Sequence, residues 1–382
     1  MGHRRSLFVS AMASALLVAG RAAAQEGEQT DLPNAVRAHQ YDRDRGTNPF
    51  RGSVAFLEQS VTTQTASVGL TPLSYVPLYE VWLSLRPRYW FDEHWSVRAR
   101  FDYTKELTNN QPTTFRDEDV FGDLWTELVY ATKLDALWKR TKGDLGVRAL
   151  WPLSKVSQAQ GTYVTLGVRG GIAHEFPIRG DDAPSFESAH VGLRFVYQHA
   201  FANATTPNDY GNFAYLRENT DAQLFVSDQI QGQTLVEHDL WGMIEGGMQL
   251  TPRFAFNAFL VLMNQWHYQP TAATVQTQMG QVSVARPNDE QFTQNLWFVA
   301  SLDYQLFNEL EIGVGYYNLA NAIDPDGQRR SILGYDNVWW SPDARIFVSL
   351  TANLDTIYDD ALGHRFSSQA KQTAQSPRST TR

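Results

Sequence analysis

The chain has 382 residues, no cysteine and a formal net charge of −9 at pH 7. In an exported protein the lack of cysteine excludes both disulfide stapling and thiol catalysis. The acidic balance offers no basic surface for nucleic acid, so we expect no nucleic-acid partner. Aromatic residues make up 13% of the chain, a share that aromatic girdles at two membrane interfaces would produce.

Residues 1–24 read as a secretory signal peptide. Arg4 and Arg5 supply the positive end, Ser6–Gly20 the apolar run, and Ala22–Ala24 a small-residue cleavage site. The apolar run is too short for a spanning helix, and no later stretch reaches the roughly 18 consecutive apolar residues that such a helix needs. The sequence therefore excludes a helical membrane protein and predicts export.

Residues 53–354 alternate apolar and polar side chains with a period of two, which places the two sets on opposite faces of a strand. A polar arm, residues 25–52, precedes this region, and a polar tail, residues 355–382, follows it; we expect both to be flexible. Many of the expected strands exceed the about five or six residues usual in soluble sheets and match the roughly 9–11 that a tilted membrane strand needs. The expected strands lie near residues 53–61, 78–91, 95–106, 121–131, 143–152, 162–176, 186–201, 234–250, 253–268, 291–306, 309–320 and 344–354.

The connections between these strands alternate in length. The longer, polar loops fall on one side of the sheet and the shorter turns on the other, which is typical of bacterial outer-membrane barrels. An even number of strands also places both termini in the periplasm. The sequence therefore predicts an all-β fold, a transmembrane antiparallel up-and-down β-barrel of about twelve strands; a soluble sandwich with its apolar face inward is the alternative. The longer loops are residues 62–77, 107–120, 202–233, 269–290 and 321–343.

Aromatic residues gather near both ends of the strands, as two interfacial belts require. Those near the inner turns are Trp90, Phe91, Trp95, Phe176, Phe186, Phe254 and Phe307. Those near the outer ends are Tyr103, Tyr197, Trp266, Tyr268, Tyr316 and Tyr317. Two features fit the pattern badly. Pro87 removes a ladder hydrogen bond in mid-strand, so we expect a bulge or a local opening there. In the first strand, Glu58 shares its parity with the apolar Val54 and Phe56.

Four arginines are expected to meet on the inner wall. A three-residue turn at Asp92–His94 places Arg88 opposite Arg98, and Arg86 opposite Arg100. Like charges directly opposite each other destabilise a sheet, so this cluster needs carboxylates, water or an anionic ligand. The residues predicted to line the lumen and set its selectivity are Arg86, Arg88, Arg98, Arg100, Asp102, Asp123, Glu127, Arg148, Arg169, Arg194, Glu245 and Asp303.

The lumen has two interpretations. A water-filled channel would select solutes by charge, as charged rings do in pores; an internal lattice of salt bridges would instead fill a narrow barrel and conduct little. Trp82, Trp125, Trp241 and Trp297 share the lumen parity. Their indole rings would either stack on sugar rings or fill space.

Catalytic and metal-binding signals are faint. No G-x-S-x-G motif occurs, and we expect no enzyme, no catalytic residue, no cofactor and no metal site. The alternatives are a lipase- or protease-type hydrolase at the outer rim, where His199 precedes Asn203 and Asn208, and a non-conducting structural or docking barrel.

Residues 53–354 resemble a Gram-negative outer-membrane β-barrel, similar in size to roughly twelve-stranded, porin-like channels for nucleosides or acidic oligosaccharides. The resemblance is one of architecture, without a family-specific motif. It implies passive diffusion of small hydrophilic solutes, with anions as the candidate class, and outer-membrane lipid and the barrel insertion machinery as partners. The last expected strand ends at Leu354 rather than at a chain terminus, so an insertion signal around Phe347 is one expectation.

Overall fold

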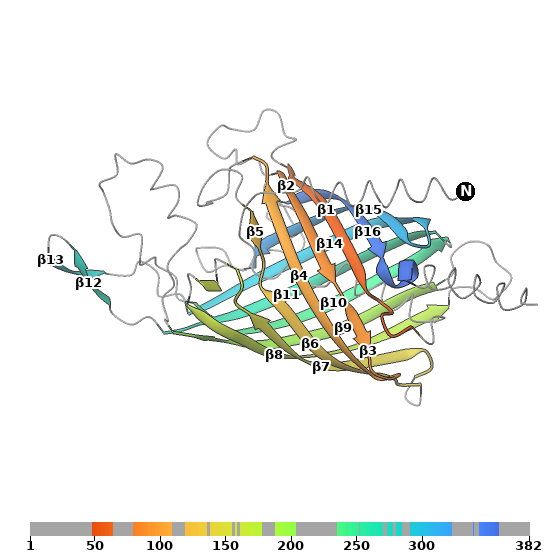
Figure 1. Cartoon of the computed structure of the whole chain (residues 1–382), viewed down its shortest axis with the longest axis horizontal. Coiled ribbons are helices and arrows are strands. Elements are labelled where there is room, and N and C mark those ends of the chain that lie inside the picture. The colour runs from red at the N-terminus through yellow and green to blue at the C-terminus, as the bar shows by residue number, and fades with distance from the viewer. Residues whose placement is uncertain are drawn as a thin grey trace, which may run out of the picture.

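The protein is a closed antiparallel barrel of twelve strands with steep tilt (Figure 1). The expected signal peptide, residues 25–47 of the expected arm, and the tail from residue 359 lie outside the described part. The computed structural model describes residues 48–63, 79–108, 119–135, 138–154, 157–158, 161–177, 188–203, 235–251, 253–269, 273–277, 280–284, 291–322, 339 and 344–358.

The strand order closes on itself. From β2 it runs through β1, β16, β15, β14, β11, β10, β9, β8, β7 and β6 to β4, and a direct β2–β4 pairing completes the ring. β3 continues β2, and β5 and β6 both pair with β4. The strands are β1 (Val54–Thr62), β2 (Tyr79–Arg86), β3 (Arg88–Trp90), β4 (Trp95–Glu106), β5 (Val120–Phe121), β6 (Leu124–Lys133), β7 (Thr141–Trp151), β8 (Thr162–Pro177), β9 (Ser188–Ala202), β10 (Val236–Thr251), β11 (Phe254–His267), β12 (Ala273–Thr277), β13 (Gly280–Val284), β14 (Phe292–Phe307), β15 (Leu310–Asn321) and β16 (Arg345–Asn353).

The predicted fold class is confirmed, and so are the twelve expected strands of the barrel. One expected loop is more than a loop: within residues 269–290, β12 and β13 form a separate two-stranded antiparallel sheet. This hairpin stands away from the barrel at the end that carries the longer connections (Figure 1).

The two faces of the barrel wall differ sharply in chemistry. Leu145, Leu193 and Ile244 point outward and are 55–61% exposed, whereas the inward-facing Arg148 and Glu245 are 5% and 1% exposed. This is the reverse of a soluble barrel or sandwich, whose apolar face is shielded from water. The outer surface suits hydrocarbon, which supplies no hydrogen bonds, and the closed ladder satisfies the backbone polar groups. The barrel is therefore of the membrane-spanning type. No described helix is long and apolar enough to cross a bilayer.

The expected aromatic belts are correct in part. Phe91, Trp95 and Phe307 are exposed at the short-turn end, and Tyr197 and Trp266 are exposed towards the long-loop end. The expectation was wrong for Trp90, Tyr317 and Tyr103, which are buried. Trp90 and Tyr317 share the inward parity, whereas Tyr103 packs at a loop and donates its hydroxyl to Asp119. Phe186 lies outside the described residues.

Pro87 opens the ladder without a bulge. The register is the same before and after it, since Leu85 pairs with Phe101 and Arg88 pairs with Arg98. The Ser53 hydroxyl accepts from the Arg88 N–H at 2.9 Å and lies 3.0 Å from the Arg88 carbonyl oxygen. A side chain therefore satisfies backbone groups next to the proline.

The poor alternation of the first strand has a simple cause. Phe56 pairs with Thr351 and Glu58 with Ser349, and all four residues are buried or nearly so on the inner face. An apolar side chain in the lumen, rather than a register fault, disturbs the pattern. The lumen of this barrel is thus not purely polar.

Both ends of the described barrel segment meet at the short-turn end. Gly52 donates its N–H to the Asp355 carboxylate at 2.9 Å, and Asn48 donates to the Asp355 carbonyl oxygen at 3.2 Å. The rings of Phe50 and Tyr358 pack edge to face with their centroids 5.2 Å apart. Residues 354–358 form a helical turn, so ordered structure continues past the expected strand end.

The turn at Asp92 has a charged acceptor. The Asp92 carboxylate accepts the N–H groups of Trp95 and His94, both at 2.7 Å, and these bonds hold the pKa of Asp92 below its ordinary value. A lowered folded-state pKa contributes stability above the unfolded pKa, and this contribution is lost as the pH falls through the folded value.

We expect the protection of the His94 and Trp95 amides against hydrogen exchange, corrected for intrinsic rates, to fall on acidification. Asp92→Asn, which keeps an acceptor oxygen, should remove this pH dependence; an unchanged pH profile in the variant would contradict the assignment.

Candidate functional site

A charged wall occupies one side of the lumen. Four cross-strand neighbours on β3, β4, β6 and β7 form a row, because Arg88 pairs with Arg98, Arg98 with Glu127, and Glu127 with Arg148. The Glu127 carboxylate binds Arg148 at 2.5 Å and Arg169 at 3.1 Å. Arg169 also forms an ion pair with Asp144. One carboxylate thus joins two guanidinium groups across three strands.

The arginines of this wall also stack on aromatic rings. The guanidinium of Arg86 lies 5.2 Å from the centroid of Trp82, and that of Arg100 lies 5.3 Å from it. Trp125 faces Arg100 at 4.9 Å and Arg148 at 4.4 Å. Ring quadrupoles attract cations, and more strongly when water is excluded. Aromatic faces therefore stabilise the expected arginine cluster together with carboxylates such as Asp102, which binds Arg100 at 2.6 Å.

Further ion pairs extend round the wall. Arg194 binds Glu245 at 3.1 Å, and Gly192 makes room for this carboxylate, since a Cβ at that position would lie 2.5 Å from a Glu245 oxygen. Arg345 on β16 binds Glu80 on β2 at 2.9 Å across β1. Glu80 is a lumen residue that was not among the candidates.

Two candidates lie apart from the arginine cluster. Asp303 accepts hydrogen bonds from Asn257 at 2.7 Å and Ser301 at 2.8 Å on another part of the wall. Asp123 accepts from the Ser154 N–H at 2.8 Å and from the Ser157 hydroxyl, so it anchors the loop after β7 at the long-loop end. The other ten candidates lie on the inner face of β2–β4, β6–β10.

An apolar part of the inner face, called the apolar wall below, lies mainly away from the arginine row, although β10, β14 and β16 also carry Glu245, Asp303 and Arg345. Its side chains are buried and mutually packed, and most of them come from β10, β11, β14, β15 and β16. The cluster comprises Trp125, Leu150, Trp241, Met243, Phe259, Val261, Met263, Trp297, Val299, Tyr317 and Phe347.

This apolar cluster includes residues from opposite sides of the ring. Trp125 lies on β6 and Trp297 on β14, and five strands separate β6 from β14 in either direction round the ring. Both tryptophans nevertheless belong to one packed cluster, to which the described residues of β8, β1 and β2 contribute none. Val196 of β9 packs against the cluster, so its side chains extend over much of the inner wall from β6 to β16. We expect this apolar cluster to narrow the lumen, and it is called the constriction below.

The constriction holds one buried donor without an acceptor. The indole of Trp241 is 3% exposed, and no described residue accepts a hydrogen bond from its Nε1–H. Such a group costs free energy when it is left dry. A donor in this position is available to a water molecule or a passing solute.

Sequence reasoning missed the apolar wall. It assigned the polar parity of each strand to the lumen, and on β11 this rule has no clear answer, because Phe254–His267 is apolar on both parities. A strand buried on both faces reads as a nearly continuous hydrophobic run. That run was the available signal for a wall that touches lipid on one face and an apolar lumen on the other.

The histidine expected for a rim hydrolase has other neighbours. His199 lies 3.2 Å from His238, nitrogen to nitrogen, while Asn203 donates its backbone N–H to the Gly161 carbonyl oxygen at 2.9 Å. Asn208 lies outside the described residues. The described contacts of His199 thus include an imidazole pair rather than a Ser–His–Asn arrangement.

No protein-family model matches the chain, and no curated protein matches it. Among solved structures the chain is similar to the COG4313 outer membrane channel from Pseudomonas putida F1, with a TM-score of 0.44 and 9% identity over 78% of this chain and 94% of that one. It is also similar to the NanC porin, with a TM-score of 0.37 and 13% identity over 78% and 98% of the two chains. The CymD monoaromatic hydrocarbon channel gives a TM-score of 0.35 and 7% identity over 86% and 94%.

Proposed function

We propose that this protein is a channel of the bacterial outer membrane for passive diffusion of small hydrophilic solutes, with a preference for anions. The observation that carries the proposal is the row of cross-strand neighbours Arg88, Arg98, Glu127 and Arg148, with Arg86 and Arg100 beside it. Charged residues that line a pore select ions by sign.

The carboxylates in the wall favour transport of an anion over its tight binding. Conduction requires that a solute binds well enough to enter and weakly enough to leave. Glu127 already neutralises part of the charge of Arg148 and Arg169, so an arriving anion competes with a resident partner. The wall therefore attracts anions without trapping them.

The constriction limits the size of the solute. The apolar cluster narrows the lumen opposite the arginines, so only a small molecule passes between the two walls. A carboxylate or another anionic group lies against the guanidinium side, and the apolar part of the solute lies against the indole and phenyl rings. The proposed class is thus small organic anions.

Selectivity in planar bilayers tests the charge part of the proposal. Arg88→Gln with Arg98→Gln is expected to lower the ratio of anion to cation permeability about two- to tenfold, since two guanidinium groups leave the lumen. Reversal potentials across a salt gradient give this ratio. Arg88→Lys with Arg98→Lys is the matched control, because it keeps both charges.

Two outcomes would count against the channel. Silent bilayers from well-folded protein would favour the non-conducting barrel, and equal reversal potentials for the Gln and Lys variants would remove the role of the arginines.

We also propose that the chain has no hydrolase activity: lipase and protease assays are expected to give the same background rate for the wild type and for His199→Ala. A rate that His199→Ala abolishes would establish the enzyme instead.

A further inference from the structure

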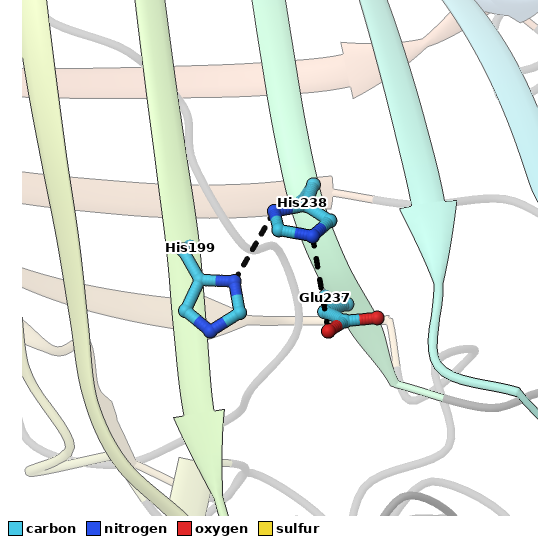
Figure 2. A group of neighbouring side chains, drawn as sticks. All are labelled: His199, Glu237 and His238. Carbon is cyan, nitrogen blue, oxygen red and sulfur yellow. Dashed lines mark hydrogen bonds and ion pairs between the residues drawn. The ribbon is translucent and has the colours of Figure 1, made fainter.

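A cluster of three side chains at the long-loop end takes no part in the lumen. His199 on β9 and His238 on β10 are direct partners in the antiparallel ladder, and Glu237 precedes His238 (Figure 2). His199 shares its parity with Tyr197, which is exposed on the outer surface. The cluster therefore lies on the outward face of the barrel, near the ends of two neighbouring strands.

A bulge brings the carboxylate to this cluster. On β10 the register shifts between Val236 and His238, which pair with the consecutive residues His267 and Trp266 on β11. Glu237 is thus the extra residue of a β-bulge. In regular alternation it would point into the lumen, but a bulge re-aims side chains, and bulges are over-represented next to functional sites. Glu237 Oε1 lies 3.7 Å from His238 Nε2.

The donor atoms are spaced for a metal ion. One atom from each of His199, Glu237 and His238 lies within 4.8 Å of the other two. The two Nδ1 atoms are 3.2 Å apart, close to the roughly 3.3 Å between two ligand atoms of a tetrahedral Zn²⁺ site with bonds of about 2.0–2.1 Å. Figure 2 shows His199 and Glu237 on either side of His238, each in contact with a different ring nitrogen of it.

The hydrogen-bonding pattern agrees with this reading. The Tyr197 hydroxyl lies 2.9 Å from His238 Nδ1, which is also the atom that His199 Nδ1 approaches. A neutral imidazole nitrogen carries either one lone pair or one proton, so in either tautomer His238 Nδ1 has one hydrogen-bonding function for two polar neighbours. A bound metal ion would instead accept a lone pair from each imidazole.

We propose that His199, His238 and Glu237 form a surface site for a divalent transition-metal ion of the Zn²⁺ or Ni²⁺ type. Two imidazoles and one carboxylate suit such ions, whereas Ca²⁺ and Mg²⁺ prefer ligands that are all oxygen. The site joins the end of β9 to the start of β10. Sequence spacing did not predict it, because the two histidines are 39 residues apart and no short His-x-x-x-His pair marks them.

Direct binding tests the site, independently of conductance. Full-length protein in detergent, purified without a histidine tag and stripped with a chelator, is titrated with Zn²⁺ by equilibrium dialysis. We expect one tight equivalent. His199→Ala and His238→Ala are each expected to raise its Kd at least about tenfold, and Glu237→Gln to raise it less. Bound Co²⁺ should give the strong visible absorption of a four-coordinate ion.

His94→Ala is the matched control, since His94 lies in the turn at the opposite end and contacts the Ala131 carbonyl oxygen. It is expected to keep the tight equivalent. Heat-dependent gel migration of each variant shows whether the barrel is folded. The proposal is overturned if folded His199→Ala with His238→Ala binds Zn²⁺ as tightly as the wild type, or if the wild type shows no tight equivalent.

Discussion

Replacing Trp241, Phe259 and Trp297 together with alanine should widen the lumen and raise single-channel conductance about twofold or more, because hydrophobic constrictions hinder water and ions. The three side chains are buried within the apolar cluster of the inner face. Phe259 and Trp297 pack edge to face, with ring centroids 5.6 Å apart. Single-channel recording in planar bilayers measures the change.

An outward-facing aromatic residue gives the matched control. Trp266 on β11 is 39% exposed, so Trp266→Ala removes the same kind of side chain from the lipid side of the wall. Its conductance is expected to equal that of the wild type. Unchanged conductance in the triple variant, with normal heat-dependent migration, would place the limiting constriction elsewhere in the barrel.

Glu127→Ala is expected to destabilise the barrel by about 3–5 kcal/mol, the usual cost of removing one partner from a buried ion pair. Its carboxylate is buried and binds both Arg148 and Arg169. Without it, the guanidinium of Arg148 loses this carboxylate, while Arg169 keeps Asp144. The midpoint of urea-induced unfolding from lipid vesicles, or of heat-dependent gel migration, reports the loss.

Two further variants isolate the pair. Glu93→Gln removes a carboxylate from an exposed turn and is expected to change stability by less than about 0.5 kcal/mol. Glu127→Ala combined with Arg148→Met should cost less than the sum of the two single changes, since the second removes the cation that the first exposes. Strict additivity would mean that the two side chains do not interact in the native barrel.

Much of the barrel was predictable because its signal is local. Alternation with a period of two fixes which side chains share a face, and strand length follows from the same pattern. The pairing of Arg88 with Arg98 was also predictable, since the register of a hairpin follows from its short turn at Asp92–His94. Pro87 opens its strand as expected and keeps this register.

The candidate site was only partly predictable. Alternation places Arg148 and Glu127 on one face, but the bond between them depends on the register of β6 with β7. Asp123 has the lumen parity, yet the loop residues Ser154 and Ser157 bind its carboxylate at the long-loop end. A parity rule cannot detect such a loop contact. The role of these residues in selectivity stays a prediction until the conductance experiments are made.

By itself the sequence determined the all-β class, the membrane-spanning length of the strands and the side of the wall on which each arginine lies, because these depend on neighbours along the chain. Only the tertiary structure decided that charged and apolar side chains share the lumen and that one apolar cluster includes residues of both β6 and β14, which lie opposite each other in the ring. It also decided that His199 meets His238 and that a bulge adds Glu237. The physical reason is the same in each case: contacts across a barrel or between paired strands depend on register and closure, which residue types along one strand do not encode.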